Sequence, residues 1–155
     1  MIEANFQAEN GNVFIERKII DSSYSYLKFQ KDFKNNFNII YGLEDNGKYC
    51  LKDTINIFND EFRFCLKFTS GKIDCIFLIS TKEFSSEEYL DLRAANNELI
   101  YLEAILNGAL KLHPQRNNNG CTWAYPWGAI STKYQRQDAS VITQIDWNRK
   151  ESFQT

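Results

Sequence analysis

The single histidine, His113, and the cysteine that follows it in the chain, Cys121, are the two residues that most resemble a catalytic pair. A histidine that takes the proton of a thiol creates a thiolate nucleophile, and the short segment between the two residues could fold them together. His113 also stands directly before Pro114 at the end of a predicted helix, where an imidazole complements the negative end of the helix dipole. We favour this structural role. A small thiol-dependent enzyme that uses Cys121 is the alternative.

Other motifs of enzymes, metal sites and cofactor sites are absent from the sequence. It contains no serine nucleophile elbow, no phosphate-binding glycine loop and no dinucleotide-binding fingerprint. No two cysteines form the Cys-x-x-Cys pair that preorganises zinc ligands. Glu87, Glu88 and Asp91 gather at the start of a predicted helix, where acids stabilise the helix dipole without any catalysis. We therefore expect no enzyme activity, no catalytic residue, no metal and no cofactor.

Length and composition predict one packed domain over residues 1–155. Hydrophobic residues make up 43% of the chain and aromatic residues 15%, which supplies ample apolar surface for a core. The formal net charge of −2 argues against a nucleic-acid-binding protein, because such proteins usually present a basic surface. A mildly acidic chain is instead compatible with a basic protein partner.

The N-terminal residues predict a cytoplasmic protein, because they lack the basic segment and the apolar core of a secretory signal. The longest uninterrupted apolar run, residues 75–79, is far too short to span a membrane. In the cytoplasm we expect Cys50, Cys65, Cys75 and Cys121 to be reduced thiols. Their even number also allows two disulfides, which is the alternative.

Hydrophobic patterns predict the elements that position these residues. Alternation of apolar and polar residues predicts strands, and Asn-Gly and Ser-Gly pairs predict tight turns between them. The predicted strands are residues 2–8 and 13–20 around Asn10-Gly11, residues 37–43 and 48–51 around Asn46-Gly47, residues 61–68 and 73–80 around residues 69–72, and two runs around residues 136–139.

A capping box at Ser85 and Glu88 predicts the start of a long amphipathic helix over residues 86–112, which Pro114 ends. Residues 21–36 predict a short helix or a loop, and residues 53–59 a helical turn or extended chain. We therefore predict the α+β class, with a mainly antiparallel sheet of six or more strands and one long helix packed on one face.

Aromatic residues are concentrated near the C-terminus, where residues 121–147 carry all three tryptophans. Tight protein interfaces draw much of their binding energy from a few Trp, Tyr and Arg side chains. We therefore predict a partner-binding surface on this segment, formed by Trp123, Tyr125, Trp127, Tyr134 and Arg136. Trp123 or Tyr125 is expected to be an exposed anchor. The alternative is that these rings close the core, as we expect for Trp147.

Two acidic pairs, Glu44-Asp45 and Asp60-Glu61, are predicted to border the same partner-binding surface. If the aromatic segment belongs to the core, the interface is expected at these acidic residues instead.

The C-terminal segment also resembles a known family. Tyr125-Pro126-Trp127-Gly128, followed by Tyr134, a polar turn and the alternating strand 141–147, is similar to the C-terminal end of small immunity proteins from bacterial toxin competition systems. The resemblance implies a single cytoplasmic α+β domain that binds and neutralises a cognate protein toxin without catalysis. It assigns no contact residues and no oligomeric state. A phage or mobile-element inhibitor of a host defence protein is the alternative.

Overall fold

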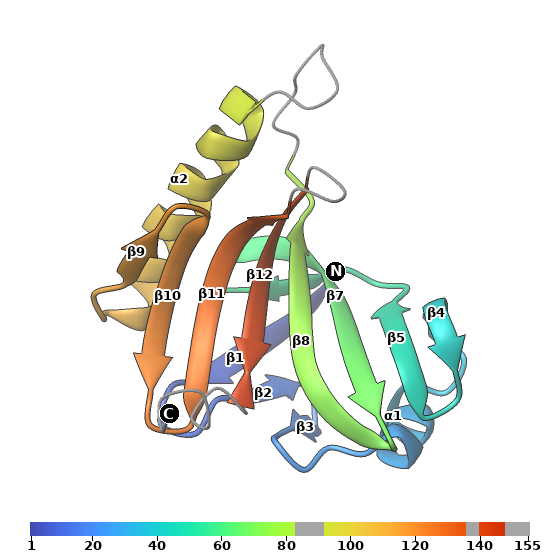
Figure 1. Ribbon diagram of the computed structural model, residues 1–155. Helices are drawn as coiled ribbons and strands as arrows, with labels where there is room; N and C mark the ends of the chain where they lie inside the picture. Colours follow the sequence, from blue (N-terminus) through green and yellow to red (C-terminus); the bar gives the residue numbers. More distant parts are fainter. Residues whose placement is uncertain (83–91, 136–139, 148–155) are drawn as a thin grey trace.

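Twelve strands of this protein pair into one sheet, and two helices of the described residues pack against it (Figure 1). The computed structural model describes residues 1–82, 92–135 and 140–147. The helices are α1 (Tyr26–Phe33) and α2 (Leu92–Leu110). The strands are β1 (Ile2–Gln7), β2 (Asn12–Ile15), β3 (Lys18–Ile20), β4 (Phe37–Leu43), β5 (Asn46–Leu51), β6 (Ile55–Ile57), β7 (Asp60–Thr69), β8 (Lys72–Ser80), β9 (Gln115–Asn117), β10 (Gly120–Tyr125), β11 (Gly128–Gln135) and β12 (Ser140–Asp146).

The sheet is mixed, because β1 and β6 run parallel while the other strand pairs of the described residues are antiparallel. The predicted α+β class is therefore confirmed at a coarse level. The structure adds a second, shorter helix, α1, to the predicted one. Helix α2 lies inside the predicted range 86–112. The predicted capping box at Ser85 and Glu88 lies outside the described residues.

Strand β7 is the branch point of the sheet. One of its edges pairs with β8 along nearly its whole length. The other edge is shared, because Phe62 pairs with Ile55 of β6 and Cys65 pairs with Cys50 of β5. From β6 the sheet continues through β1 and β2 to β3, whereas from β5 it continues only to β4. From β8 it continues through β12, β11 and β10 to β9.

The core lies on one face of this sheet. Figure 1 shows α1, α2 and the strands β1–β3 behind the long strands, and α2 contacts β11 and β12. One row of directly paired side chains crosses six strands, and every member is fully buried, as expected for the covered face of a sheet. The row consists of Trp123, Ile130, Ile145, Ile76, Leu66 and Tyr49.

Two of the predicted hairpins are confirmed, although four residues, 8–11, connect the strands of the first one instead of a two-residue turn. The Asn10-Gly11 turn joins β1 and β2, and Gly11 adopts a φ of 77° while its N–H donates to the Gln7 carbonyl at 2.8 Å. Ser70 and Gly71 join β7 and β8 with φ values of 50° and 79°. Positive φ at both Ser70 and Gly71 matches the right-handed twist of the flanking strands, whereas in the first hairpin only Gly11 of the connecting residues has a positive φ.

The predicted turn at Asn46-Gly47 is wrong. The chain turns two residues earlier, at Glu44-Asp45, and Leu43 pairs with Asn46. Gly47 lies inside β5 opposite Gly42, where an added Cβ would come within 2.6 Å of the Tyr41 carbonyl oxygen. The glycine therefore permits a close approach of two strands rather than a turn.

The prediction that all four cysteines are reduced is also wrong. Cys50 and Cys65 form a disulfide, because the register of β5 and β7 places them directly opposite each other with their Cα atoms 4.0 Å apart. Cys75 and Cys121 are free and buried. Among the described residues, no helix combines the length and the apolar character that a membrane crossing requires.

The hydroxyl groups of Thr132 and Thr143 give the first testable prediction. These residues are paired across β11 and β12, and both side-chain oxygens are buried without a hydrogen-bond partner in the structure. Thr143→Val replaces the buried hydroxyl with a methyl group. We expect the free energy of unfolding, measured by urea denaturation, to rise by about 1 kcal/mol because the desolvation penalty disappears.

A matched control is Ile145→Val on the same strand, which removes a methylene from the core and should lower the free energy of unfolding by roughly 0.5–1.5 kcal/mol. If Thr143→Val is instead less stable than the wild type, the hydroxyl has an acceptor in the folded protein.

Candidate partner-binding surface

Trp123, one of the two candidates for an exposed anchor, lies in the core. Its side chain is 0% exposed, and its indole N–H donates to the Asn107 side-chain oxygen of α2 at 3.0 Å. Strand β10 directs this ring onto the face that α2 covers. The expected exposure of Trp123 is therefore wrong, while its predicted contact with a partner stays a prediction.

The other two tryptophans connect the C-terminal strands to the first hairpin. The indole N–H of Trp127 donates to the Ala8 carbonyl at 2.7 Å, and that of Trp147 donates to the Gly11 carbonyl at 2.9 Å. Trp147 is 6% exposed, so its predicted place in the core is confirmed. Trp127 is half-buried at the two-residue turn between β10 and β11, where the sequence indicated only a bend.

The remaining predicted aromatic contacts keep some exposed surface. Tyr125 stacks on Trp127 with ring centroids 5.0 Å apart and an angle of 13° between the rings. Burial raises the pKa of the Tyr125 hydroxyl, whose oxygen has no hydrogen-bond partner in the structure. Tyr134 is half-buried against the core. Arg136 lies outside the described residues, so its predicted contact stays a prediction.

The two acidic pairs lie at opposite ends of β7 and do not border one surface. Asp60 and Glu61 begin β7, whereas Glu44 and Asp45 precede the part of β5 that pairs with the end of β7. A strand of this length separates them by roughly 25 Å. Glu61 is engaged internally, because it accepts a hydrogen bond from Thr54 Oγ1 at 2.5 Å. The sequence could not show this separation, since it depends on which strands are neighbours.

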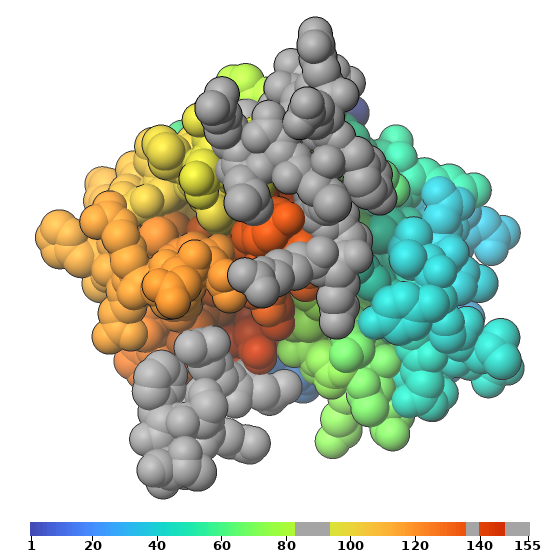
Figure 2. Space-filling model, turned by 45° about the horizontal axis from the view of Figure 1, so that its top comes forward, coloured from blue at the N-terminus to red at the C-terminus, as the bar shows by residue number. Residues whose placement is uncertain are grey.

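More than half of the exposed large apolar side chains of the described residues lie on β4 or on α1. Nine large hydrophobic residues of the described chain are exposed, and four of them lie on β4, while a fifth, Leu27 of α1, lines a cavity with Glu44 and Asp45 at the end of β4. We call these five residues the β4 patch: Leu27 (76% exposed), Ile39 (60%), Ile40 (49%), Tyr41 (51%) and Leu43 (80%). Figure 2 shows the segment around β4, in cyan, at the margin of the molecule away from the orange C-terminal strands.

A bulge explains why three consecutive apolar residues of β4 are exposed. The register of β4 with β5 shifts between Ile39 and Tyr41, so Ile40 has no direct partner on β5. The extra residue places Ile39 on the face of Tyr49 and Tyr41 on the opposite face, with Lys48, and the bulge bends the strand. Several exposed apolar side chains gathered on one strand favour a site of protein contact. Sequence alternation predicted the strand at residues 37–43 but could not show that its residues after Phe37 stay largely exposed.

The acidic turn beside the β4 patch is held rigidly. The Gly71 N–H donates to the Asp45 carbonyl at 3.0 Å, and the Ser70 N–H donates to Asn46 Oδ1 at 2.8 Å. The Tyr49 hydroxyl donates to the Glu44 carbonyl from inside the core. These bonds join the β4–β5 turn to the β7–β8 turn, so the two exposed carboxylates are presented in a fixed position.

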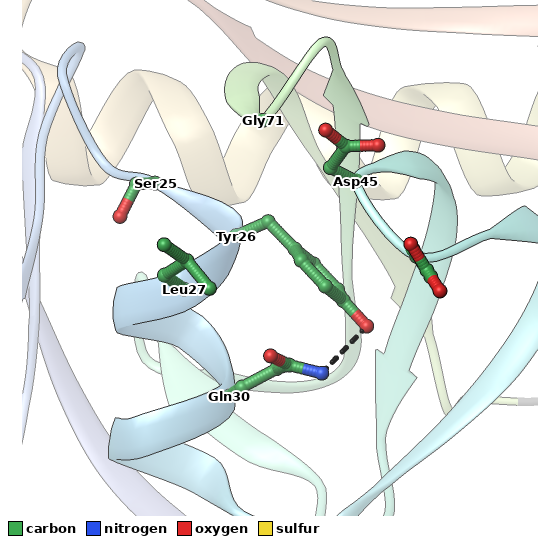
Figure 3. Close-up of a pocket in the computed structure, with 7 residues that line it drawn as sticks. Ser25, Tyr26, Leu27, Gln30, Asp45 and Gly71 are labelled. Atoms are coloured by element: carbon green, nitrogen blue, oxygen red, sulfur yellow. Dashed lines mark hydrogen bonds between the residues drawn. The ribbon is translucent and has the colours of Figure 1, made fainter.

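A cavity of about 430 Å³ lies between this turn and α1 (Figure 3). Tyr26 and Gln30 line it from the helix, and Asp45 and Gly71 line it from the two turns. The Tyr26 hydroxyl accepts a hydrogen bond from Gln30 Nε2 at 2.8 Å, which holds the ring along one side of the cavity. Among the described residues, neither Glu44 nor Asp45 forms a salt bridge. The cavity therefore combines an aromatic ring with two carboxylates that lack a cation.

The residues considered for catalysis are not arranged as a catalytic pair. His113 is exposed after the end of α2, whereas Cys121 is buried in β10. Burial and then the Glu103 carboxylate raise the pKa of the Cys121 thiol, and the Arg116 guanidinium opposes that rise. Burial raises the pKa of Cys75 to about 12, with Asp146 and Asp74 adding to the effect. In the described part of the chain, no three His, Cys, Asp or Glu side chains form a group able to hold a metal ion.

Comparison with known proteins gives one informative match. No protein-family model and no curated protein matches the sequence. The fold is similar to that of a chain in the solved structure of Rhs1-CT in complex with cognate immunity protein RhsI1, with a TM-score of 0.57 and 8% sequence identity. The match covers 97% of this chain and 93% of that chain. At this identity the likeness concerns the fold.

The position of Trp123 gives a second prediction. Trp123→Ala should lower the free energy of unfolding by roughly 3–5 kcal/mol, because it empties a large core site. Trp123→Phe retains a ring and loses the bond to Asn107, so it should cost less. Thermal and urea unfolding measure both variants. A Trp123→Ala protein with a near-normal melting temperature would contradict the buried position.

The thiols give a third prediction. Raised pKa values keep Cys75 and Cys121 protonated near neutral pH, and only the thiolate is strongly nucleophilic. We expect iodoacetamide to label neither residue in the native protein at pH 7.5, both after denaturation, and Cys50 and Cys65 only after reduction. Mass spectrometry of digested samples gives the count. Selective native labelling of Cys121 would support the thiol enzyme.

Proposed function

We propose that this chain is an immunity protein that binds a cognate toxin domain of the Rhs type and neutralises it without catalysis. The observation that carries the proposal is the fold match, which spans nearly all of both chains and comes from a complex of Rhs1-CT with its cognate immunity protein. The sequence resemblance at Tyr125-Pro126-Trp127-Gly128 points to the same class independently. We propose that it acts in the cytoplasm.

We assign the toxin contact to the β4 patch together with the Glu44-Asp45 turn. The aromatic residues of the C-terminal segment are less suited to this role, because Trp123, Trp127 and Trp147 each donate their indole N–H inside the protein. The β4 patch instead offers side chains that are half to four-fifths exposed. An apolar centre beside charged groups is the usual organisation of a specific interface.

Neutralisation by binding alone requires a tight complex, and the rigidity of this surface favours one. A dissociation constant of about 1 nM corresponds to roughly 12 kcal/mol of binding free energy. Ordering a flexible loop on binding reduces that free energy. The backbone bonds from Gly71 and Ser70 hold the Glu44-Asp45 turn in place before any partner arrives.

The disulfide is compatible with a cytoplasmic role because of its position. In the cytoplasm, glutathione and thioredoxin normally keep cysteines in the reduced thiol form. Cys50 is 3% exposed and Cys65 is 0% exposed, so reductants have little access to either sulfur. Access is one of the factors that set the rate of thiol–disulfide exchange.

The fourth prediction tests this function with the Rhs-type toxin domain encoded beside the gene of this protein. Co-expression should rescue growth, and the two purified proteins should form a stable complex. Leu43→Asp should weaken binding at least about 10-fold, because it places a charge in the apolar centre of the interface. Isothermal titration calorimetry measures the affinity.

Ile100→Asp is the matched control, because Ile100 is 65% exposed on α2, outside the β4 patch. It should bind like the wild type. Both variants should melt near the wild-type temperature, since both side chains are exposed. If wild type neither rescues growth nor binds the toxin domain, the proposed function is wrong. If Leu43→Asp binds normally, the interface lies elsewhere.

A further inference from the structure

The outer edge of β4 is unpaired within the described residues, because β4 pairs only with β5. The main-chain bond from the Lys52 N–H to the Asn36 carbonyl, at 3.0 Å, fixes which groups face outward. In an antiparallel pair, bonded and non-bonded residue pairs alternate. Asn38 therefore bonds to Cys50, whereas Phe37 and Ile39 direct their N–H and C=O groups away from β5.

The other two free ends of the sheet are better protected against strand pairing than β4, whose bulge at Ile40 interrupts its edge but leaves residues 37–39 in regular register. Strands β3 and β9 have three residues each, and they carry Lys18 and Arg116 respectively. Short length and a charged side chain are the usual protections of an exposed edge. Strand β4 has seven residues, Phe-Asn-Ile-Ile-Tyr-Gly-Leu, with no charged residue and no proline. An edge of this kind attracts a further strand.

The groups beside β4 indicate the chemistry of that strand. Glu44 and Asp45 follow β4 directly and form no salt bridge in the described structure. The cavity next to them is lined by the Tyr26 ring, and carboxylates with an aromatic face suit a guanidinium or an ammonium group. An apolar strand would complement Ile39 on one face of the sheet and Tyr41 and Leu43 on the other. A basic residue at its end would complement the turn.

We infer that β4 binds its partner by strand addition: an apolar strand of the toxin domain pairs with the outer edge of β4, and a Lys or Arg beside it enters the cavity at Glu44-Asp45. This inference rests on the proposed function and specifies how the same surface recognises the toxin domain. Main-chain hydrogen bonds supply affinity in such complexes, and the side-chain pockets supply specificity.

The fifth prediction concerns the main-chain hydrogen bonds of the β4 edge. Amide hydrogen exchange is measured on the full chain, both free and saturated with the toxin domain that is encoded beside its gene. The amides of Phe37 and Ile39 should exchange at least about 100-fold more slowly in the complex, because they gain acceptors. The amide of Asn38 is the internal control, since its bond to β5 protects it in both states.

Two variants separate the main chain from the side chain. Ile39→Ala removes the apolar side chain and keeps the outward N–H, whereas Ile39→Pro removes both and leaves the bonds to β5 in place. We expect Ile39→Pro to bind the toxin domain at least about 10-fold more weakly than Ile39→Ala. If Ile39→Pro does not fold, the exchange data on the wild type decide the question.

The outcomes distinguish this inference from the proposed function. Strand addition is overturned if the wild type binds the toxin domain but Phe37 and Ile39 stay unprotected, or if a folded Ile39→Pro binds as well as Ile39→Ala. In the free protein, these amides could also become more protected as the protein concentration rises. That result would identify a second copy of this chain as the occupant of the edge, and it would also overturn strand addition by the toxin domain. If the wild type does not bind the toxin domain at all, the proposed function fails and this inference fails with it.

Discussion

The shape of this molecule depends on how one edge of β7 is shared. Strand β7 has ten residues, and neither β6 nor β5 is placed to pair with all of it, so β6 pairs with its beginning and β5 with its end. Neighbouring strands twist relative to one another, so two strands on one edge lead the chain in different directions. The branch through β6 passes to the first hairpin, whose Ala8 and Gly11 carbonyls accept the indoles of Trp127 and Trp147. The branch through β5 ends at β4, which keeps a free edge.

The same division explains which residues are buried and which remain available. The indole N–H groups of the three tryptophans find acceptors inside the fold, so burial of these rings leaves no unpaired donor. The β5–β4 branch has only α1 to cover it, and that helix packs Phe29 against Phe37 and Tyr49 while Leu27 points to solvent. A strongly apolar strand therefore stays exposed beside a rigid acidic turn, and the surface for a partner follows from the strand order.

Local sequence patterns predicted local structure well. The turns at Asn10-Gly11 and Ser70-Gly71, the strand at residues 37–43 and the body of α2 follow from glycine conformation and hydrophobic period. The predictions were wrong where the role of a residue depends on a contact with a distant part of the chain. Gly47 serves a close strand approach to Gly42, Cys50 meets Cys65 through strand register, and Trp123 meets Asn107 through the packing of α2. The acidic residues Glu44 and Asp45 were predicted from the sequence as partner contacts. Only the strand order shows that the neighbouring strand, β4, is a free edge of the sheet.

A nuclear magnetic resonance titration tests the central claim most directly, because the protein carries its own reporters of both surfaces. The indole N–H signals of Trp123, Trp127 and Trp147 report on the C-terminal segment, and the backbone signals of β4 and the Glu44-Asp45 turn report on the free edge. When the adjacent-encoded toxin domain is added to the isotope-labelled protein, we predict that the largest shifts occur in β4 and this turn while the three indole signals stay near their free positions. Large shifts of the indole signals with unchanged β4 signals would contradict this account. They would show that the interface lies on the aromatic C-terminal segment instead.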